Sequence, residues 1–329
     1  MLPLRTQITL ALAAGFVFIT LGSARMQASD WKQLSPAHSP AARTYAAMAY
    51  DPVSQKIVLF GGVGFNGFLD DTWAFDGRDW RPLKTNGSPG GRAAANMAFD
   101  KPSGKLVLFG GVNGELLQDT WLFDGATSTW TQAAPVHVPT AAAGPLLFSQ
   151  PKTGQALMFG GFNVMLKIPN LNDTYRWTGS DWEKLNRSTS PPGRGWGIAV
   201  TDPVRNDVLV AGGLGDTIRT DDTWVWSGSK WSRVSPATQV QALGGPGSAF
   251  DPDLGAVVVF GGFGVSVGFD VNDTWSWDGT NWTQLQTASA PSAREGVSMA
   301  YDPIHHHLVL FGGEEGNILR VQNDTWVLQ

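Results

Sequence analysis

A short apolar run that ends in two glycines recurs six times along this chain of 329 residues. The runs read VLFGG, VLFGG, LMFGG, VLVAGG, VVFGG and VLFGG, and the first glycines of the doublets are Gly61, Gly110, Gly160, Gly212, Gly261 and Gly312. The steps between these glycines are 49, 50, 52, 49 and 51 residues. A period of this length indicates a repeat architecture, and a continuous apolar run is typical of a strand covered on both faces.

Each repeat is predicted to contain four strands. In the first copy, alternation and turn chemistry place strands at residues 44–51 and 56–62, then a variable loop, then a third strand at 71–77. Asp76-Gly77 turns the chain into a fourth strand that carries Trp80. Four antiparallel strands in one repeat describe a blade of a β-propeller, so the chain is predicted to be all-β.

Two aromatic positions follow each doublet. The triplet Asp-Thr-Trp begins at Asp71, Asp119, Asp222, Asp273 and Asp324, and the third copy has Asp173-Thr174-Tyr175. A further tryptophan stands at Trp80, Trp130, Trp182, Trp231 and Trp282, and the sixth is Trp31, close to the amino end. We expect the strand of Trp31 to pair with that of Asp324, because an open ring would leave two unpaired edges. The later tryptophans are predicted to fill the core between blades, and the triplet aspartates to bond loop amides.

These markers resemble the kelch repeat, in which a Gly-Gly doublet ends the second strand and six residues separate the two aromatic positions. Trp73 and Trp80 keep that spacing. The resemblance covers residues 30–329 and is to bacterial secreted kelch repeat-containing proteins. It implies a galactose oxidase-like fold: a six-bladed kelch β-propeller over residues 29–329, its last blade closed by the N-terminal strand. Kelch propellers include binding platforms, structural proteins and enzymes, so the fold alone does not select a function.

The amino end has the pattern of a signal peptide over residues 1–24. Arg5 precedes an apolar run from Ile8 to Leu21, and small residues follow up to Ala24. The run is 14 residues long, short of the roughly 20 that a spanning helix needs. We therefore expect a secreted or periplasmic monomer with no membrane span after the signal is removed; an uncleaved, membrane-tethered form is the alternative.

Composition excludes several kinds of site. The net charge is −5 and no basic run occurs, which argues against nucleic acid as a partner. Zero cysteines exclude disulfides, thiolate metal sites and the cysteine–tyrosine radical centre of galactose oxidase. The run His305–His307 alternates faces of a strand and offers no ligand set, so no metal and no cofactor is predicted.

The residues that precede each first strand differ between copies. Equivalent positions hold Arg43, Arg92, Ala142, Arg194, Leu243 and Arg294. One interpretation is that each guanidinium bonds carbonyls or an aspartate within its own blade. The other is that the four arginines form an anion site at one mouth of the central channel.

The loops between the second and third strands vary most and are predicted to lie on the face of that mouth, which is typical of the binding side of a repeat protein. Trp196 stands where other copies have Tyr, Ala or Gly, and is expected to be a solvent-facing platform. The candidate ligand-binding residues are Arg43, Tyr45, Arg92, Asn113, Arg194, Trp196, Arg294, Glu295, Glu314 and Glu315, with Glu115 and Asp216 beside them.

This composition of the mouth predicts an extracytoplasmic binding module that recognises a protein or carbohydrate ligand at the cell envelope. The alternative is a carbohydrate-active isomerase of the sialic acid mutarotase or epimerase type, in which arginine and glutamate serve proton transfer to an anionic sugar. No catalytic residue is assigned, and an enzyme is the less favoured of the two readings.

Overall fold

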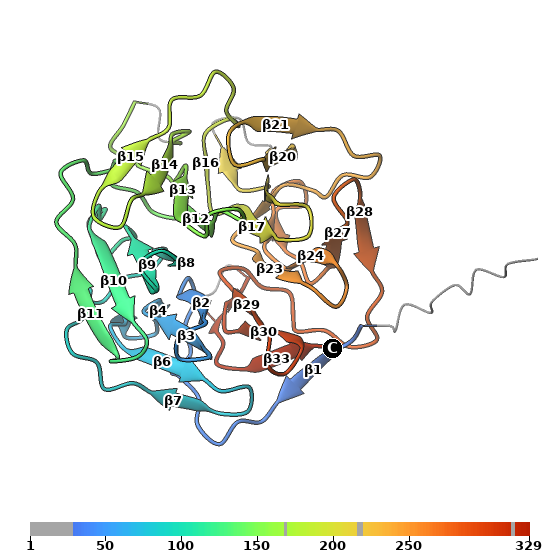
Figure 1. The fold of residues 1–329 in the computed structure, drawn as a ribbon. Helices are drawn as coiled ribbons and strands as arrows, with labels where there is room; N and C mark the ends of the chain where they lie inside the picture. Colours follow the sequence, from blue (N-terminus) through green and yellow to red (C-terminus); the bar gives the residue numbers. More distant parts are fainter. Residues whose placement is uncertain (1–28, 168–169, 216–219, 317–319) are drawn as a thin grey trace, which may run out of the picture.

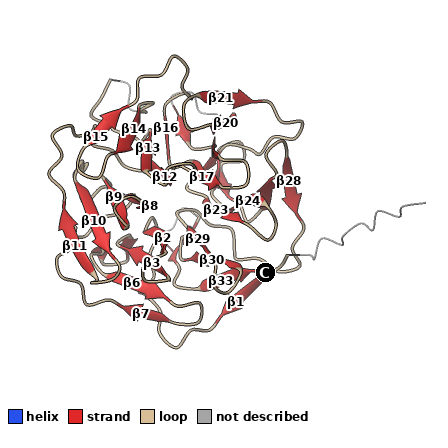
Figure 2. Cartoon of the chain, in the orientation of Figure 1, coloured by secondary structure: helices blue, strands red, loops and turns tan. Residues whose placement is uncertain are grey.

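The structure is a computed structural model that describes residues 29–167, 170–215, 220–316 and 320–329. The predicted signal peptide (1–24) and Asp216 lie outside these ranges. Every helix or strand assigned within them is a β-strand, as Figure 2 shows. No helix of the described residues is long and apolar enough to cross a membrane.

Six four-stranded antiparallel sheets are arranged around a central axis as the blades of a propeller (Figure 1). Blades 1 to 3 consist of β2 (Ala47–Asp51), β3 (Lys56–Phe60), β6 (Thr72–Phe75) and β7 (Trp80–Pro82); β8 (Asn96–Asp100), β9 (Lys105–Phe109), β10 (Thr120–Asp124) and β11 (Thr129–Gln132); and β12 (Leu146–Ser149), β13 (Ala156–Phe159), β14 (Thr174–Trp177) and β15 (Trp182–Lys184). Blades 4 to 6 consist of β17 (Ile198–Asp202), β18 (Asp207–Ala211), β20 (Thr223–Trp226) and β21 (Trp231–Val234); β23 (Gly247–Asp251), β24 (Ala256–Phe260), β27 (Thr274–Trp277) and β28 (Trp282–Leu285); and β29 (Ser298–Asp302), β30 (His307–Phe311), β33 (Thr325–Leu328) and β1 (Trp31–Leu34).

The two ends of the chain share the last blade, as the sequence predicts. Strand β1 pairs antiparallel with β33, so that Trp31 lies opposite Leu328 and Leu34 opposite Thr325. The dark blue β1 lies beside the red β33 in Figure 1. The ring is therefore closed by hydrogen bonds between residues separated by almost the whole chain.

The fourth-strand tryptophans join neighbouring blades. Each indole N–H donates to the threonine of the Asp-Thr-aromatic triplet in the preceding blade; the pairs are Trp31–Thr274, Trp80–Thr325, Trp130–Thr72, Trp182–Thr120, Trp231–Thr174 and Trp282–Thr223, at 2.8 to 3.1 Å. All six tryptophans are buried. The prediction that they form the core between blades is confirmed.

The Gly-Gly doublet lets the next blade approach closely. Gly61 and Gly62 have φ of 69° and 95°. Positive φ values of this kind are unfavourable for residues that have a Cβ atom. A Cβ on Gly61 would lie 2.6 Å from the Arg92 carbonyl oxygen of blade 2, and the Gly62 N–H donates to that oxygen at 2.8 Å. The equivalent bond at the closure of the ring runs from the Gly313 N–H of blade 6 to the Arg43 carbonyl oxygen of blade 1, at 3.0 Å.

The first strand is shorter than predicted at its beginning. Strand β2 begins at Ala47 rather than at Thr44, because Tyr45 has a left-handed φ of 54° that interrupts the extended backbone. The residues before each first strand instead pair with the residues after the Gly-Gly doublet. Short strands formed in this region are β4 (Val63–Gly64), β5 (Gly67–Phe68), β16 (Arg194–Gly195), β19 (Leu214–Gly215), β22 (Leu243–Gly244), β25 (Phe263–Gly264), β26 (Phe269–Asp270), β31 (Glu314–Glu315) and β32 (Arg320–Val321).

Candidate functional site

A hydrogen-bonded ring of six residues surrounds the central channel where the first strands begin; this end is the channel mouth. The ring residues, one from each blade, are Tyr45, Ala94, Gly144, Trp196, Gly245 and Gly296. The backbone N–H of each donates to the carbonyl oxygen of the equivalent residue in the preceding blade, at 2.8 to 3.0 Å. All six have left-handed φ values between 53° and 63°. The bonds fix the spacing of the six blades at the mouth.

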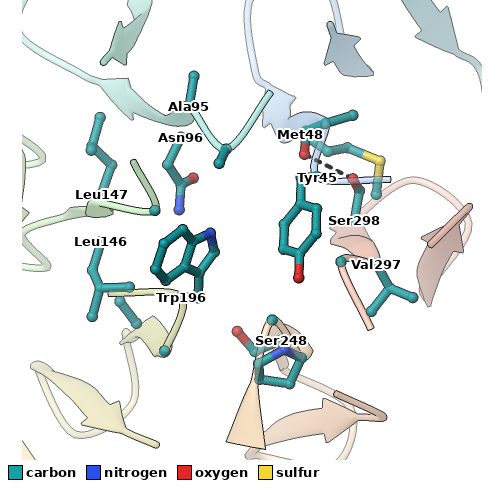
Figure 3. Close-up of a pocket in the computed structure, with 18 of the residues that line it drawn as sticks. Tyr45, Met48, Ala95, Asn96, Leu146, Leu147, Trp196, Ser248, Val297 and Ser298 are labelled. Atoms are coloured by element: carbon teal, nitrogen blue, oxygen red, sulfur yellow. Dashed lines mark hydrogen bonds between the residues drawn. The ribbon is translucent and has the colours of Figure 1, made fainter. Parts of the chain in front are cut away.

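Two of the ring residues are large aromatics, and they face each other across the cavity. Tyr45 belongs to blade 1 and Trp196 to blade 4, which are opposite in a ring of six, and Figure 3 shows their side chains on either side of the opening. Glycines make room for them: a Cβ on Gly144 would lie 2.8 Å from ring atoms of Trp196, and one on Gly296 3.0 Å from ring atoms of Tyr45. A left-handed φ is unfavourable for bulky residues, and such strain concentrates at functional sites.

The cavity between these aromatics has a volume of about 210 Å³, and more of its surface is polar than apolar, although side chains such as Met48 and Leu147 also line it. Met48, Met97 and Met299 crowd one side of it, while Ala199 and Ser248 leave more room on the side of blades 4 and 5. The volume is smaller than the ~300 to 1,000 Å³ of typical drug-sized ligand sites. The cavity suits one side chain or one sugar ring.

The four arginines are held inside their own blades. Arg43 is buried, forms an ion pair with both carboxylate oxygens of Asp71, and donates to the carbonyl oxygen of Gly61 at 3.0 Å. Arg92 and Arg294 repeat this arrangement with Asp119 and Asp324, and Arg194 forms an ion pair with Asp222 through a single contact of 2.7 Å. Of the two interpretations of the arginines, the structure shows the internal ion pair, so these guanidinium groups do not make the mouth an anion site.

The triplet aspartates serve these pairs, which corrects their predicted role. Asp71 accepts hydrogen bonds from Arg43 and from the indole N–H of Trp73 at 2.7 Å, rather than from loop amides. Burial by itself would raise the pKa of Asp71, but the bonds from Arg43 and Trp73 outweigh it and hold the pKa below its usual value. The carboxylate is therefore a charged structural group.

Where a blade lacks the arginine, its fourth strand supplies the partner. In blade 3 the Lys184 ammonium donates to Asp173 at 2.8 Å, and in blade 5 the Gln284 amide donates to Asp273 at 2.9 Å. The triplet aspartate therefore has a side-chain partner in every blade. The partner is an arginine in four blades, a lysine in blade 3 and a glutamine in blade 5.

Blade 6 carries two glutamates directly opposite each other at the mouth. Glu295 and Glu314 exchange backbone hydrogen bonds of 3.0 and 2.9 Å, and the Tyr45 hydroxyl donates to Glu295 Oε2 at 2.9 Å. Burial, together with the charges of Asp270 and Glu314, raises the pKa of Glu295 to about 7, although the hydrogen bond from Tyr45 opposes this rise. Burial and Asp270 also raise the pKa of Glu314. Like charges placed opposite each other repel, so this pair lowers the stability of blade 6.

The other five blades are apolar at the position of Glu314. We call these residues the collar: Val63, Val112, Phe162, Leu214 and Phe263, each bridged to the segment before the first strand of its blade. Phe162 of the collar packs on Trp196, with ring centroids 5.3 Å apart. The mouth thus consists of an apolar collar interrupted by one acidic sector, which we define as Glu295, Glu314 and Asp270.

Exposed apolar side chains extend outward from the collar. They lie in the loops after the second strands of blades 1, 3 and 5, and we call them the crown: Phe65, Phe68, Val164, Met165, Leu166, Val267 and Phe269. Phe65 and Met165 are the most exposed of them, at 92% and 83%.

The structure brings some of the predicted residues together and separates others. Tyr45, Glu295 and Glu314 meet at one side of the mouth, and Trp196 faces them. Asn113 is exposed in the blade 2 loop, where its side chain bonds the Glu115 N–H at 3.3 Å. Glu315 turns away to an ion pair with Arg294 at 3.7 Å and another with Arg320 at 3.9 Å.

Sequence reasoning overlooked Asp270 and the crown. Asp270 comes from the loop of blade 5, and its carboxylate accepts the Gly316 N–H of blade 6 at 2.6 Å. The available signal was the presence of Phe65, Met165 and Phe269 in loops where polar residues are expected.

Comparisons with known proteins agree on the architecture. A model of the KLHDC2/KLHL20/DRC7 Kelch-repeats domain matches residues 17–161. A solved structure titled "Structure of YjhT" is similar with a TM-score of 0.67 and 18% identity, covering 88% of this chain and 96% of that one. At this identity the likeness concerns the fold alone. A search of the curated proteins finds no match.

Proposed function

Because the chain is a kelch-repeat β-propeller, we propose that it is a binding module that recognises a protein or carbohydrate ligand through the channel mouth. The observation that carries this proposal is the gathering of crown, collar and the aromatic pair on one face of the ring. Exposed apolar patches of this kind mark interaction sites on soluble proteins. Loops on a rigid scaffold are also the usual location of binding residues.

The aromatic pair supports recognition of a ligand group inside the mouth. Tyr45 and Trp196 each have an apolar body and a polar tip, a combination enriched at binding sites. Their backbones are tied into the hydrogen-bonded ring, so little ordering is required when a ligand binds between them.

The test compares variants of the two faces. Trp196→Ala is compatible with the backbone, since Ala94 has the same φ of 53° at the equivalent position. The matched control is Val204→Ser with Ile304→Ser, two exposed apolar residues in turns after the first strands, at the opposite end of the blades. Binding is measured on a glycan array and a peptide library after both variants are shown to melt like wild type. We expect Trp196→Ala to lose ligands that the control retains; equal binding by both variants would reject the mouth as the site.

An extracytoplasmic location is part of this proposal and rests on the leader pattern at residues 1–24. Fractionation of expressing cells and N-terminal sequencing of the product test it. We expect a product in the periplasm or medium that begins after Ala24. A cytoplasmic product that retains Met1 would contradict the location without affecting the binding site.

A second candidate is the carbohydrate-active isomerase, and the Tyr45–Glu295 hydrogen bond favours it. A carboxyl with a pKa of about 7 can both donate and accept a proton at neutral pH. The arginines that would hold an anionic sugar are occupied by aspartates, so the substrate would be a neutral sugar. Exchange between sugar anomers, followed by NMR, should be accelerated by wild type and lost in Glu295→Gln with the sugar still bound. Absence of exchange across a panel of neutral sugars would reject the enzyme and leave the binding module.

A further inference from the structure

We propose that the partner at the mouth is a polypeptide segment in which a lysine or arginine is flanked by apolar side chains. The basic side chain lies at the acidic sector, and the apolar side chains lie on the crown. This inference rests on the proposed binding function, and it adds the chemical class and the charge of the partner.

The crown calls for a partner larger than the cavity. Its residues come from blades 1, 3 and 5, which alternate around the ring and therefore surround the mouth on three sides. A ligand confined to a cavity of about 210 Å³ leaves Phe65, Met165 and Phe269 in water. A polypeptide segment can place one side chain in the cavity and others on the loops, because its length increases by ~3.3 Å per residue.

The charge of the partner follows from the acidic sector. Within the described part of the chain, no ion pair joins Glu295, Glu314 or Asp270 to a cation. The four buried arginines are already paired within their blades, and Arg320 pairs with Glu315. An apolar segment that covered these carboxylates without a counter-charge would leave them buried and unpaired, which is strongly unfavourable. Charge complementarity therefore favours a cation from the partner.

The aromatic pair is placed to receive that cation. The Tyr45 hydroxyl donates to Glu295, so a basic group that lies on the Tyr45 ring is also next to the carboxylate. A cation over an aromatic face is attracted by the ring electrons, and the aliphatic part of a lysine or arginine packs on apolar surface. Trp196 offers a second face across the cavity (Figure 3).

Other ligands fit these features less well. An acidic peptide or an anionic sugar would meet three carboxylates, and among the described residues the arginines of the mouth are already paired with carboxylates. A neutral sugar could stack on Trp196, but it would leave the crown uncovered. Both remain distinguishable outcomes of the experiment below.

The experiment selects random peptides displayed on phage against the whole protein. Enriched peptides are synthesised, and their dissociation constants are measured by titration calorimetry on wild type and three double variants. These are Glu295→Gln with Glu314→Gln in the acidic sector, Phe65→Ser with Met165→Ser in the crown, and Val204→Ser with Ile304→Ser as the control on the opposite face.

We expect enriched peptides to carry a lysine or arginine among apolar residues. Their affinity should fall at least about tenfold on the acidic-sector variant and on the crown variant, and stay unchanged on the control. Replacing the basic residue of the peptide by norleucine should cause the same loss on wild type but little further loss on the acidic-sector variant, because both changes remove one interaction.

The other outcomes separate this inference from the binding function. Peptides without a basic residue that depend on the crown would overturn the charge of the partner and leave the binding face intact. Glycan binding with no enriched peptide would overturn the partner class alone. Peptides insensitive to both the crown and the acidic-sector variants would overturn the inference and the proposed face together.

Discussion

Replacing Glu295 by glutamine should stabilise the propeller at alkaline pH. Glu295 lies opposite Glu314 in the backbone ladder of blade 6. Burial, together with Asp270 and Glu314, raises its pKa from the usual 4.5 to about 7, although the Tyr45 hydroxyl opposes this. Glutamine keeps the shape of the side chain and an oxygen that accepts the Tyr45 hydrogen bond, but it carries no charge. The substitution therefore isolates the electrostatic cost of the acidic sector.

The size of the effect follows from linkage between protonation and folding. Between pH 4.5 and about 7, the folded protein holds a proton at Glu295 that the unfolded chain has released, so stability falls as pH rises through this window. At ~1.36 kcal/mol for each pH unit, the ionised form costs roughly 3 kcal/mol. Because Glu295 is only half-buried, water screens part of this cost, and we expect a gain of about 1 to 2 kcal/mol. This corresponds to roughly 2 to 3 °C in Tm for a domain of this size.

The assay is thermal unfolding followed by tryptophan fluorescence at about pH 4 and about pH 8. We expect Glu295→Gln to melt above wild type at the higher pH and together with it at the lower pH, where both states of the wild type are protonated. Glu115→Gln, in an exposed loop, is the matched control and should change neither. A Tm of the variant equal to or below that of wild type at about pH 8 would refute the claim that the ionised Glu295 carboxylate destabilises the folded protein.

Three further substitutions test the architecture. Trp31→Ala in β1 removes a buried indole and its hydrogen bond across the closure, so unfolding should cost about 3 to 5 kcal/mol less; an unchanged melting curve would show that β1 does not hold the ring. Arg194→Met leaves Asp222 without its ion pair, so the free energy of unfolding, measured by urea denaturation, should fall by about 3 to 5 kcal/mol. Adding Asp222→Asn should restore part of the loss, and full stability of the single variant would contradict the structural role of the pair. Gly144→Ala places a Cβ 2.8 Å from the Trp196 ring and should alter the near-UV circular dichroism at a stability cost of about 1 kcal/mol; an identical spectrum would contradict the packing of that ring.

The arginines show why sequence left the site undecided. Arg43 and Asp71 are 28 residues apart, and nothing in the spacing states whether the guanidinium turns into its blade or into the channel. The structure places it in the blade, where it also bonds the carbonyl oxygen of Gly61. The sequence repeat therefore predicted where the arginine lies along the chain, but it did not predict which way its side chain points.

The acidic sector shows the complementary case. Glu295 and Glu314 were singled out because they depart from the repeat, and the structure places them opposite each other. Asp270 joins them from a different blade. Its loop lies against blade 6, where the Gly316 N–H donates to the Asp270 carboxylate, and no local pattern in the sequence predicts this contact.

The amino-acid sequence by itself determined the number of blades, the strand order within each blade and the closure of the last blade by Trp31. Those features depend on residues that recur with a fixed period, and a packed ring requires the same interface six times. Only the tertiary structure decided which charges face the mouth. The orientation of these side chains depends on the hydrogen-bonded ring that includes Tyr45 and Trp196 and on the distances between loops of neighbouring blades. Those distances exist only in the folded protein, and a side chain turns toward the partner that folding brings within reach.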